Sequence, residues 1–179
     1  MTIYQRDSIR NYIRNVPDFP KRGIMFRDIT TLIKDPILFR GMIDDLSDSY
    51  RKSDLTAIMG IDSRGFIIGA PLAYDIGIGF IPARKLGKLP STKIQEQYQL
   101  EYGEEGLEIH KDAITEGNKI LVVDDLLATG GTAAAAAKLI ERLHGVIVGF
   151  AFLVELSYLG GREKLRGYDV LSLCKYDSE

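Results

Sequence analysis

Continuous runs of apolar residues alternate along this chain with stretches whose apolar residues recur at helical spacing. Runs such as Ile120–Val123 and Val146–Val148 contain no polar positions, which is typical of parallel strands covered on both faces. Apolar runs of this kind, bounded by turn residues, predict strands. We predict five strands, in chain order: Thr56–Ile61, Gly79–Ala83, Lys119–Val123, Val146–Glu155 and Tyr168–Leu173.

Helical spacing or helix-end signals mark the segments between these strands. Pro36 suits the first turn of one helix. The run Ala133–Ala137 favours another, because alanine is the best helix former, and Gly145 is expected to stop it. The predicted helices are Tyr4–Asn15, Asp35 to about Arg51, Gly65–Tyr74 and Thr132–Leu143.

Three connecting segments remain. Asp18–Thr31 is predicted to be an ordered loop, and Arg84–Glu96 a basic loop. Gln97–Tyr102 and Leu107–His110 are predicted to form a hairpin, joined by a turn at Gly103-Glu104-Glu105-Gly106.

Strands that alternate with helices predict an open α/β fold, in which a mostly parallel, twisted sheet is flanked by helices. The 179 residues suit one domain spanning residues 1–179. Ligands bind in such folds beyond the carboxyl ends of the strands. Two loops rich in polar residues leave strand ends here, Asp62-Ser63-Arg64-Gly65 and Asp124–Thr132, and both are candidate ligand loops.

The second loop has the chemistry of an anion site. Gly130 and Gly131 lack Cβ atoms, so that backbone amides can approach an anion closely, and Thr129 and Thr132 add hydroxyl donors. The loop runs into a predicted helix, whose first amides have no intrahelical partner and whose dipole attracts negative charge. We therefore predict that Ala128–Thr132 binds a phosphate. The segment lacks the lysine of a Walker A loop and the third glycine of a dinucleotide fingerprint.

The neighbouring carboxylates Asp124 and Asp125 narrow the choice of ligand. Two carboxylates would repel a bare phosphate, but they can accept hydrogen bonds from sugar hydroxyls or hold Mg²⁺ through water. A ribose 5-phosphate satisfies both halves of the motif. The alternative is a plain strand–turn–helix corner, which the acid pair and both threonines together argue against.

A second anion site is predicted where the first strand ends. Ser63 and Arg64 can donate to phosphate oxygens, and the amides of the following helix can help. Capping of that helix by Asp62 or Ser63 is an equally good interpretation. The next loop supplies three more cations, which taken alone would be a solvated basic loop: Arg84, Lys85 and Lys88.

Composition limits the remaining classes of function. A net charge of −2 gives no bulk attraction for nucleic acid or an anionic membrane, so neither is an expected partner. The single cysteine, Cys174, allows no internal disulfide and favours a reducing cytoplasm. Val146–Val154 is far shorter than the ~20 residues of a membrane helix. Met1–Arg14 has no continuous apolar block, so no signal peptide is expected.

The segment Val122–Thr132 resembles the 5-phosphoribosyl 1-pyrophosphate (PRPP) signature of type I phosphoribosyltransferases, in the form found in the adenine branch. The likeness covers nearly the whole chain. Its other motifs are Pro17-Asp18-Phe19-Pro20, Gly23, Phe26-Arg27-Asp28-Ile29, Asp62-Ser63-Arg64-Gly65-Phe66, Arg84-Lys85, Gly87-Lys88-Leu89-Pro90, Leu100-Glu101-Tyr102-Gly103, Val154-Glu155-Leu156 and Gly161-Arg162.

The resemblance implies a type I phosphoribosyltransferase fold, with hood elements at about residues 17–31 and 84–110. It implies transfer of phosphoribose from PRPP to adenine, which yields AMP and pyrophosphate in purine salvage, in a homodimer. The implied cofactor is Mg²⁺, held mainly by substrate and through water by Asp124 and Asp125. Ser63, Arg64 and the three basic loop residues would hold pyrophosphate, with Arg64 also catalytic.

The adenine site is likewise implied by the resemblance alone. In the family, the segment equivalent to Met25-Phe26-Arg27 reads the base through its backbone, while the Phe26 ring stacks on the base. Leu127 is expected to line the same site. Glu101 would handle a purine proton, either as general base or only as hydrogen-bond acceptor. The alternatives are a core aromatic for Phe26 and an exposed hairpin residue for Glu101.

Two other functions remain open at this stage. One is a phosphoribosyltransferase acting on hypoxanthine, guanine, xanthine or orotate. The other is a PRPP-sensing regulator, but such repressors usually carry a DNA-binding domain of about 60–70 residues, and no basic run suited to nucleic acid is present. Glu101 and the hood lysines favour an enzyme.

Overall fold

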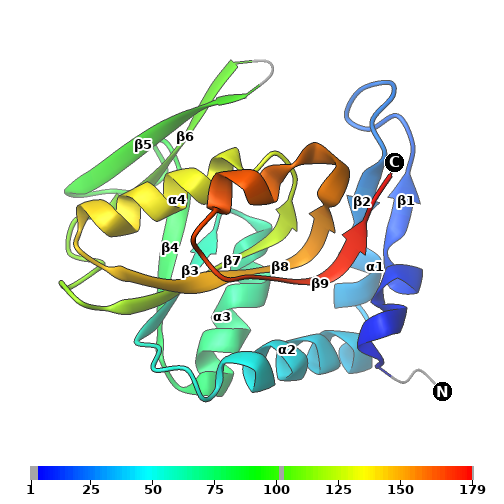
Figure 1. The fold of residues 1–179 in the computed structure, drawn as a ribbon, viewed down its shortest axis with the longest axis horizontal. Helices are drawn as coiled ribbons and strands as arrows, with labels where there is room; N and C mark the ends of the chain where they lie inside the picture. The colour runs from blue at the N-terminus through cyan, green and yellow to red at the C-terminus, as the bar shows by residue number, and fades with distance from the viewer. Residues whose placement is uncertain (1–3, 101–102, 179) are drawn as a thin grey trace.

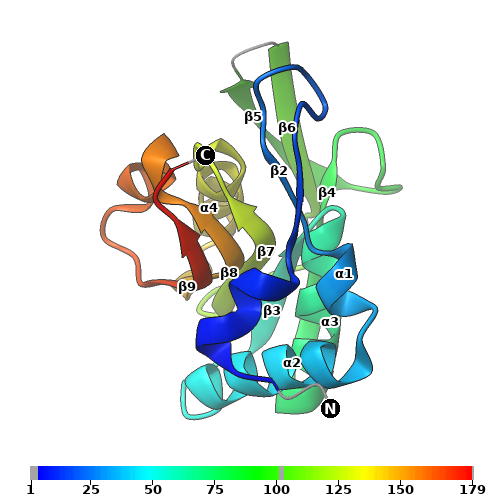
Figure 2. The same cartoon turned by 90° about the vertical axis from the view of Figure 1, so that its right-hand side faces the viewer.

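A twisted sheet forms the centre of the computed structural model, which describes residues 4–100 and 103–178 (Figures 1 and 2). Within these residues the sheet has the strand order β5-β6-β4-β3-β7-β8-β9. Five parallel strands form most of it: β3 (Ala57–Ile61), β4 (Gly79–Lys85), β7 (Lys119–Leu127), β8 (Val146–Leu156) and β9 (Val170–Tyr176). The hairpin β5 (Lys93–Leu100) and β6 (Gly103–His110) joins β4 in antiparallel fashion. The predicted α/β fold with a mostly parallel sheet is confirmed.

Helices cover both faces of this sheet (Figure 1). One face carries α2 (Pro36–Tyr50), α3 (Arg64–Ile76), the short α1 (Thr30–Ile33) and the 3-10 helix η1 (Arg6–Tyr12). The other carries α4 (Gly131–Arg142) and the 3-10 helix η3 (Gly161–Leu165), which follows η2 (Ser157–Leu159). None of the helices within the described residues is long and apolar enough to cross a membrane.

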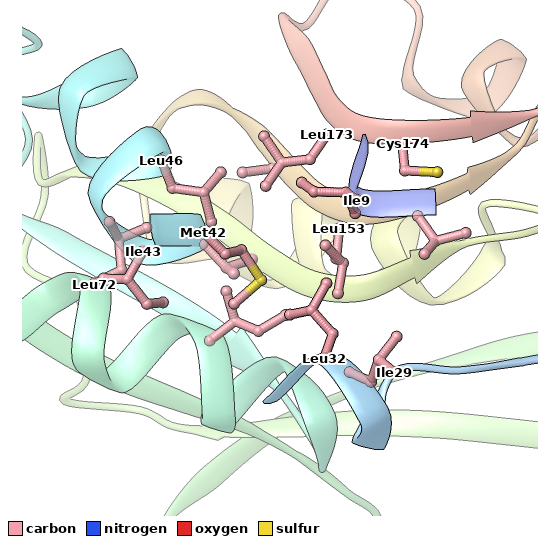
Figure 3. Packing of buried hydrophobic residues seen from close by; sticks show 14 of the residues in the cluster. Ile9, Ile29, Leu32, Met42, Ile43, Leu46, Leu72, Leu153, Leu173 and Cys174 are labelled. Atoms are coloured by element: carbon pink, nitrogen blue, oxygen red, sulfur yellow. The ribbon is translucent and has the colours of Figure 1, made fainter. Parts of the chain in front are cut away.

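Burial on both faces explains the continuous apolar runs. Leu121 and Val123 of β7 pack on the side of α2 and α3, while Ile120 and Val122 pack on the side of α4, and all four are fully buried. Figure 3 shows the first cluster, in which Met42 and Leu46 of α2 gather with Leu72 of α3 and Leu153 of β8. Each such side chain contributes about 1.5–3 kcal/mol when it is buried. The two-sided core fixes the strand ends that carry the site.

Helix α2 begins as its sequence predicts. The Asp35 carboxylate accepts hydrogen bonds from the backbone N–H groups of Ile37 (2.9 Å) and Leu38 (3.1 Å), and Pro36 occupies the first turn. The end of α4 differs from prediction. His144, not Gly145, adopts the left-handed conformation (φ 59°), and the N–H of Gly145 donates to the Ile140 carbonyl.

The N-terminal segment contains more structure than predicted. Within the expected loop Asp18–Thr31 lies β2 (Phe26–Asp28), which pairs in antiparallel fashion with β1 (Arg14–Val16). The helix expected over Tyr4–Asn15 is the shorter 3-10 helix η1. Strands of three residues have too few positions to show alternation, which is why the pattern missed them. We refer to β1, β2 and the loop between them as the arm.

Two strand boundaries near the site were also predicted wrongly. β7 continues to Leu127, so Asp124 and Asp125 belong to a strand and face opposite sides of it. β5 begins at Lys93, inside the predicted basic loop, and the predicted turn Gly103–Gly106 lies in β6, where it pairs with residues 97–100. Figure 1 shows the β5–β6 hairpin and the arm rising on either side of the carboxyl ends of the central strands.

Candidate active site

A cavity of about 470 Å³ opens at the carboxyl ends of β3 and β7. It lies where a parallel sheet is expected to bind ligands. Eleven residues predicted to bind substrate line it: Ser63, Arg64, Lys85, Asp124, Asp125, Leu127, Ala128, Thr129, Gly130, Gly131 and Thr132. The structure therefore brings the two predicted anion loops to one cavity.

The loop Ala128–Gly130 turns the chain from β7 into α4. Gly130 has φ +76°, a conformation that L side chains rarely adopt, and a Cβ there would collide with the Gly161 carbonyl oxygen. A Cβ on Gly161 would in turn collide with the Ala128 carbonyl oxygen. Two backbones thus meet without side chains between them. The start of α4, whose first amides have no intrahelical partner, lines the cavity.

A partly buried ion pair anchors the segment next to Gly161: the Glu155 side chain is 4% exposed and the Arg162 side chain 40%. Arg162, the next residue, donates to the Glu155 carboxylate through Nε (2.9 Å) and Nη2 (2.6 Å), and its Nη1 donates to the Val170 carbonyl (3.0 Å). Ser172 adds a hydrogen bond to Glu155 (2.7 Å). The Arg162 guanidinium holds the pKa of Glu155 below its ordinary value, which opposes the effect of burial. The resemblance includes Glu155, Gly161 and Arg162 among its motifs, but the sequence assigns them no role, because only folding brings Gly161 to residue 128.

The acid pair has one buried and one half-buried member. Asp125 is 5% exposed and its Oδ2 lies 2.7 Å from Nε of Arg64, while its backbone N–H donates to Oδ1 of Asp124 (2.8 Å). Burial raises the pKa of Asp124 well above its ordinary value, and the neighbouring Asp125 charge raises it further. Burial also raises the pKa of Asp125, against the opposing charge of Arg64. Hydroxyl donors or a cation in the cavity would therefore stabilise the ionised form of both carboxylates.

The predicted pyrophosphate loop packs directly against β7. A Cβ on Gly65 would lie 2.6 Å from the Val123 carbonyl oxygen, so glycine lets the start of α3 approach the end of β7. Ser63 does not cap α3 with its side chain, and Asp62 instead accepts a hydrogen bond from Arg84 Nε (3.0 Å). The capping interpretation is therefore wrong.

The basic loop residues are placed unequally. Lys85 lines the cavity, with its Nζ 3.5 Å from Glu105. Arg84 is held by Asp62 and by the Lys88 carbonyl (3.3 Å), and neither Arg84 nor Lys88 lines the cavity.

Other cavity residues were not singled out from the sequence. Thr132 donates to the Tyr98 hydroxyl (3.1 Å), which donates to Glu105 (3.2 Å). These two hydrogen bonds link the start of α4 to the β5–β6 hairpin. The alternation of residues along β5 could have identified Tyr98 as facing inward, because Ile94 and Tyr98 lie on the same face of the strand and pack against the hydrophobic cluster that contains α4. The further lining residues are Ile61, Asp62, Leu107, Leu126, Ala133 and Phe152.

Phe26 connects the arm to the cavity indirectly, because it does not line the cavity itself but its ring lies over Arg64, which does. The Phe26 ring is half-buried, meets Phe19 edge-on at 5.1 Å, and lies 5.3 Å from the Arg64 guanidinium. Arg27 points to the other side of β2, where it packs on Tyr176, so its side chain does not reach the cavity. Met25 is half-buried and does not line it. Glu101 lies outside the described residues.

Glu108 of β6 organises the basic loop. It is fully buried (0% exposed). Its carboxylate accepts hydrogen bonds from Lys88 N (2.8 Å), Leu89 N (2.6 Å), Gln95 Nε2 (2.9 Å) and Lys93 Nζ (2.9 Å). Burial alone would raise the pKa of Glu108, but these donors lower it to about 2. The loop that carries Lys88 is thus ordered around a buried carboxylate.

Glu108→Gln is expected to destabilise the fold at neutral pH, by about 2–3 kcal/mol in urea unfolding. The folded-state pKa is depressed, so ionised Glu108 stabilises the fold above its ordinary value of 4.5, and this contribution is lost as the pH falls toward about 2. The difference between variant and wild type should therefore shrink as the pH is lowered. Glu116→Gln, at an exposed position, is the control. A loss independent of pH would contradict this account.

Comparison with known proteins agrees with the geometry. Residues 31–175 match the phosphoribosyl transferase domain. The adenine phosphoribosyltransferase of Solibacter usitatus is 53% identical over 169 residues, which cover 94% of this chain and 98% of that protein. The crystal structure of the enzyme from Thermoanaerobacter pseudethanolicus superposes with a TM-score of 0.93 at 49% identity, over 96% of this chain and 100% of that one. The Saccharomyces cerevisiae enzyme was solved with adenine and an imino-altritol bisphosphate. It superposes with a TM-score of 0.89 at 38% identity, over 94% of this chain and 97% of that one. The chain belongs to the phosphoribosyltransferase family, within its adenine phosphoribosyltransferase branch.

Proposed function

We propose that this cavity transfers the phosphoribosyl group of PRPP to adenine, forming AMP and releasing pyrophosphate, a step of purine salvage. The observation that carries the proposal is the meeting of two helix-start anion loops, at Ser63-Arg64 and Ala128–Gly131, in one cavity with two carboxylates. A substrate with phosphate at one end and pyrophosphate at the other matches this pair of loops. The yeast relative crystallised with adenine and a bisphosphate supports the same pairing of ligands.

Each loop has a separate role in this proposal. The amides and hydroxyls of Ala128–Thr132 hold the 5′-phosphate, and Asp124 and Asp125 accept hydrogen bonds from the ribose hydroxyls. Ser63 and Arg64 hold the pyrophosphate together with Lys85 of the hood, which lines the cavity. Arg84 and Lys88 of the hood do not line it and would reach the pyrophosphate only when the hood closes. The hood, at residues 17–31 and 84–110, keeps water from PRPP during the reaction.

The carboxylates suit a metal that its substrate mainly holds. Among the described residues, no group of three or more His, Cys, Asp or Glu side chains is placed to hold an ion. Asp125 already contacts Arg64, and Asp124 is half-buried beside it. We therefore assign Mg²⁺ to PRPP, with Asp124 and Asp125 reached through water. When bound there, the ion neutralises charge on the departing pyrophosphate.

The protein itself has little covalent work to do. Displacement at C1′ through an oxocarbenium-like state needs the two substrates to be aligned and the leaving group to be stabilised. Arg64 contributes at the leaving group. Phe26 covers the base, beside Met25, Leu127 and the backbone of Arg27. Glu101 acts on the purine proton, either as general base or only as hydrogen-bond acceptor.

A panel of bases tests the substrate. The protein is mixed with PRPP, Mg²⁺ and adenine, hypoxanthine, guanine, xanthine or orotate in turn, and nucleotide is detected by chromatography. AMP formation from adenine is expected. Turnover with orotate or hypoxanthine but not with adenine would overturn the proposal.

Glu101→Ala is expected to lower kcat for AMP formation by roughly 10²-fold or more, in line with loss of a positioned acid–base group. Steady-state rates with saturating adenine and PRPP measure this effect. Glu116→Ala is the control, because Glu116 is an exposed residue that does not line the cavity. A wild-type rate in Glu101→Ala would show that Glu101 has no role in catalysis.

We further propose a cytoplasmic homodimer. Exposed apolar side chains support a second copy as partner: Phe19 and Ile24 in the arm, and Ile67 and Tyr74 on α3, of which Tyr74 is 90% exposed. The lone, buried Cys174 suits a reducing compartment. Sedimentation equilibrium should give the mass of two chains, and the mass of one would refute the dimer.

A further inference from the structure

Tyr176, near the end of β9, is a fully buried aromatic residue whose hydroxyl is not used. Its side chain is 2% exposed. The hydroxyl lies near the Cys174 thiol but makes no hydrogen bond of ordinary geometry with any described group. A buried hydroxyl without a hydrogen-bond partner destabilises the fold. We therefore infer that the aromatic ring, not the hydroxyl, is the part of Tyr176 that matters at this position.

Two arginines from distant segments lie over that ring. The guanidinium carbon of Arg10, in η1, is 4.2 Å from the ring centroid, and that of Arg27, in β2, is 4.0 Å. Both distances are within the ~6 Å over which an aromatic face attracts a cation. Tyr176 thus ties the N-terminal helix and the arm to the last strand of the sheet.

Arg27 is the link to the arm. It is 8% exposed, its Nη1 donates to Asn15 Oδ1 (2.5 Å), and its Nε has no partner among the described groups. Asn15 is its neighbour across the β1–β2 ladder. A buried guanidinium with so few hydrogen bonds relies on the Tyr176 ring to compensate its charge.

Phe26 lies on the opposite face of the same strand, because successive residues of a strand point to opposite sides. Its ring faces the Arg64 guanidinium at 5.3 Å, and Arg64 lines the cavity. The position of Arg27 on Tyr176 therefore sets where Phe26 stands relative to the cavity.

We propose that Tyr176 is a positioning residue for the purine base: its ring, through Arg27, holds the arm where Phe26 covers the base. The inference rests on the proposed role of Phe26 at adenine. It assigns a substrate-specific role to a residue that touches neither the cavity nor the substrate. Tyr176 does not line the cavity, and the charged groups over its ring are Arg10 and Arg27, so we expect PRPP binding to depend on it much less than adenine binding does.

The test compares Tyr176→Leu with Tyr176→Phe. Leucine stays apolar but loses the aromatic face, and KM for adenine is expected to rise by about tenfold, while KM for PRPP stays within about twofold of wild type. Phenylalanine keeps the ring and should restore the wild-type KM for adenine. Equal rises in both KM values, or no rise, would overturn the proposal.

A matched control separates positioning from general loss of stability. Tyr168→Leu removes another tyrosine, a half-buried one that packs on Phe150 at 5.4 Å and is remote in sequence from the arm. It should lower the thermal midpoint without changing the ratio of the two KM values. If Tyr176→Leu does not fold, Arg27→Lys provides a second test, because it replaces the planar guanidinium that stacks on the Tyr176 ring. It should raise KM for adenine without raising KM for PRPP. An unchanged ratio in Arg27→Lys would overturn the proposal.

Phe26→Ala distinguishes this inference from the proposed function. If Phe26→Ala leaves KM for adenine unchanged, the role of Phe26 itself is wrong, and the positioning role falls with it. If Phe26→Ala raises KM but Tyr176→Leu does not, only the positioning role is wrong. If both act through the same contact, the double variant should match Phe26→Ala alone, and additive effects would contradict the proposal.

Discussion

Gly130→Val is expected to abolish detectable AMP formation in a protein that still folds. The residue has φ +76°, and any Cβ would collide with the Gly161 carbonyl, so the loop Ala128–Gly130 must move away from η3. The amides that we propose hold the 5′-phosphate would move with it. Because displacing a binding group by about 1 Å costs on the order of 10²-fold, and lost anion donors a similar factor each, we expect kcat/KM for PRPP to fall by at least about 10³-fold. Steady-state assay measures the rate, and circular dichroism checks the fold.

Two further variants separate collision from backbone strain. Gly160→Ala introduces a Cβ at φ +65° with open space around it, so strain acts there without collision. It should cost some stability and keep most of the activity. Gly161→Ala has no positive φ but collides with the Ala128 carbonyl, so it should be nearly inactive. Equal losses in the Gly160 and Gly161 variants would show that the contact between η3 and the loop is unimportant.

The place of the loop Ala128–Thr132 at the cavity was predictable because the signals for it are local in sequence. A buried strand, two acids, two glycines and a helix start follow one another within Val122–Thr132, and the structure places all of them at one cavity. The parallel sheet was predictable for a similar reason, because burial on both faces is recorded directly in runs such as Ile120–Val123.

The supports of the site were not predictable in this way. Gly161 touches the loop only because β8 returns the chain to the same edge of the sheet. The bonds of Arg84 to Asp62 and of Tyr98 to Thr132 also join segments far apart in sequence. Single residues that meet across 20 or more positions leave no periodicity to detect.

Tyr176 illustrates the same limit more sharply. On sequence alone it is an aromatic residue close to the chain end, and nothing near it suggests a ligand. Only the packing of η1 and β2 against β9 shows that its ring carries two guanidinium groups. The identity of the base resists local reasoning for a related reason, because the backbone readout proposed for the arm would leave no side-chain signature.

Asp125→Asn is also expected to abolish detectable AMP formation. Oδ2 of Asp125 lies 2.7 Å from Nε of Arg64, so this carboxylate joins the proposed ribose side of the cavity to the proposed pyrophosphate side. The amide keeps the volume but loses the charge that orients Arg64 and an acceptor for a ribose hydroxyl. We expect kcat/KM for PRPP to fall by at least about 10³-fold, measured with saturating Mg²⁺. Asp54→Asn is the control: it breaks the exposed ion pair with Lys119 at the other end of β7 and should be fully active.

The same substitution should leave the fold at least as stable as wild type at neutral pH. Burial raises the pKa of Asp125 despite Arg64, so its ionised form destabilises the folded state, and this effect is absent below the ordinary value of 3.8. Asparagine removes it at every pH. The thermal midpoint of Asp125→Asn at neutral pH should therefore equal or exceed that of wild type, and the difference should vanish in acid. A variant that is inactive because it unfolds would refute this account. Inactivity with an undiminished midpoint would show that the buried carboxylate serves the reaction at the expense of stability.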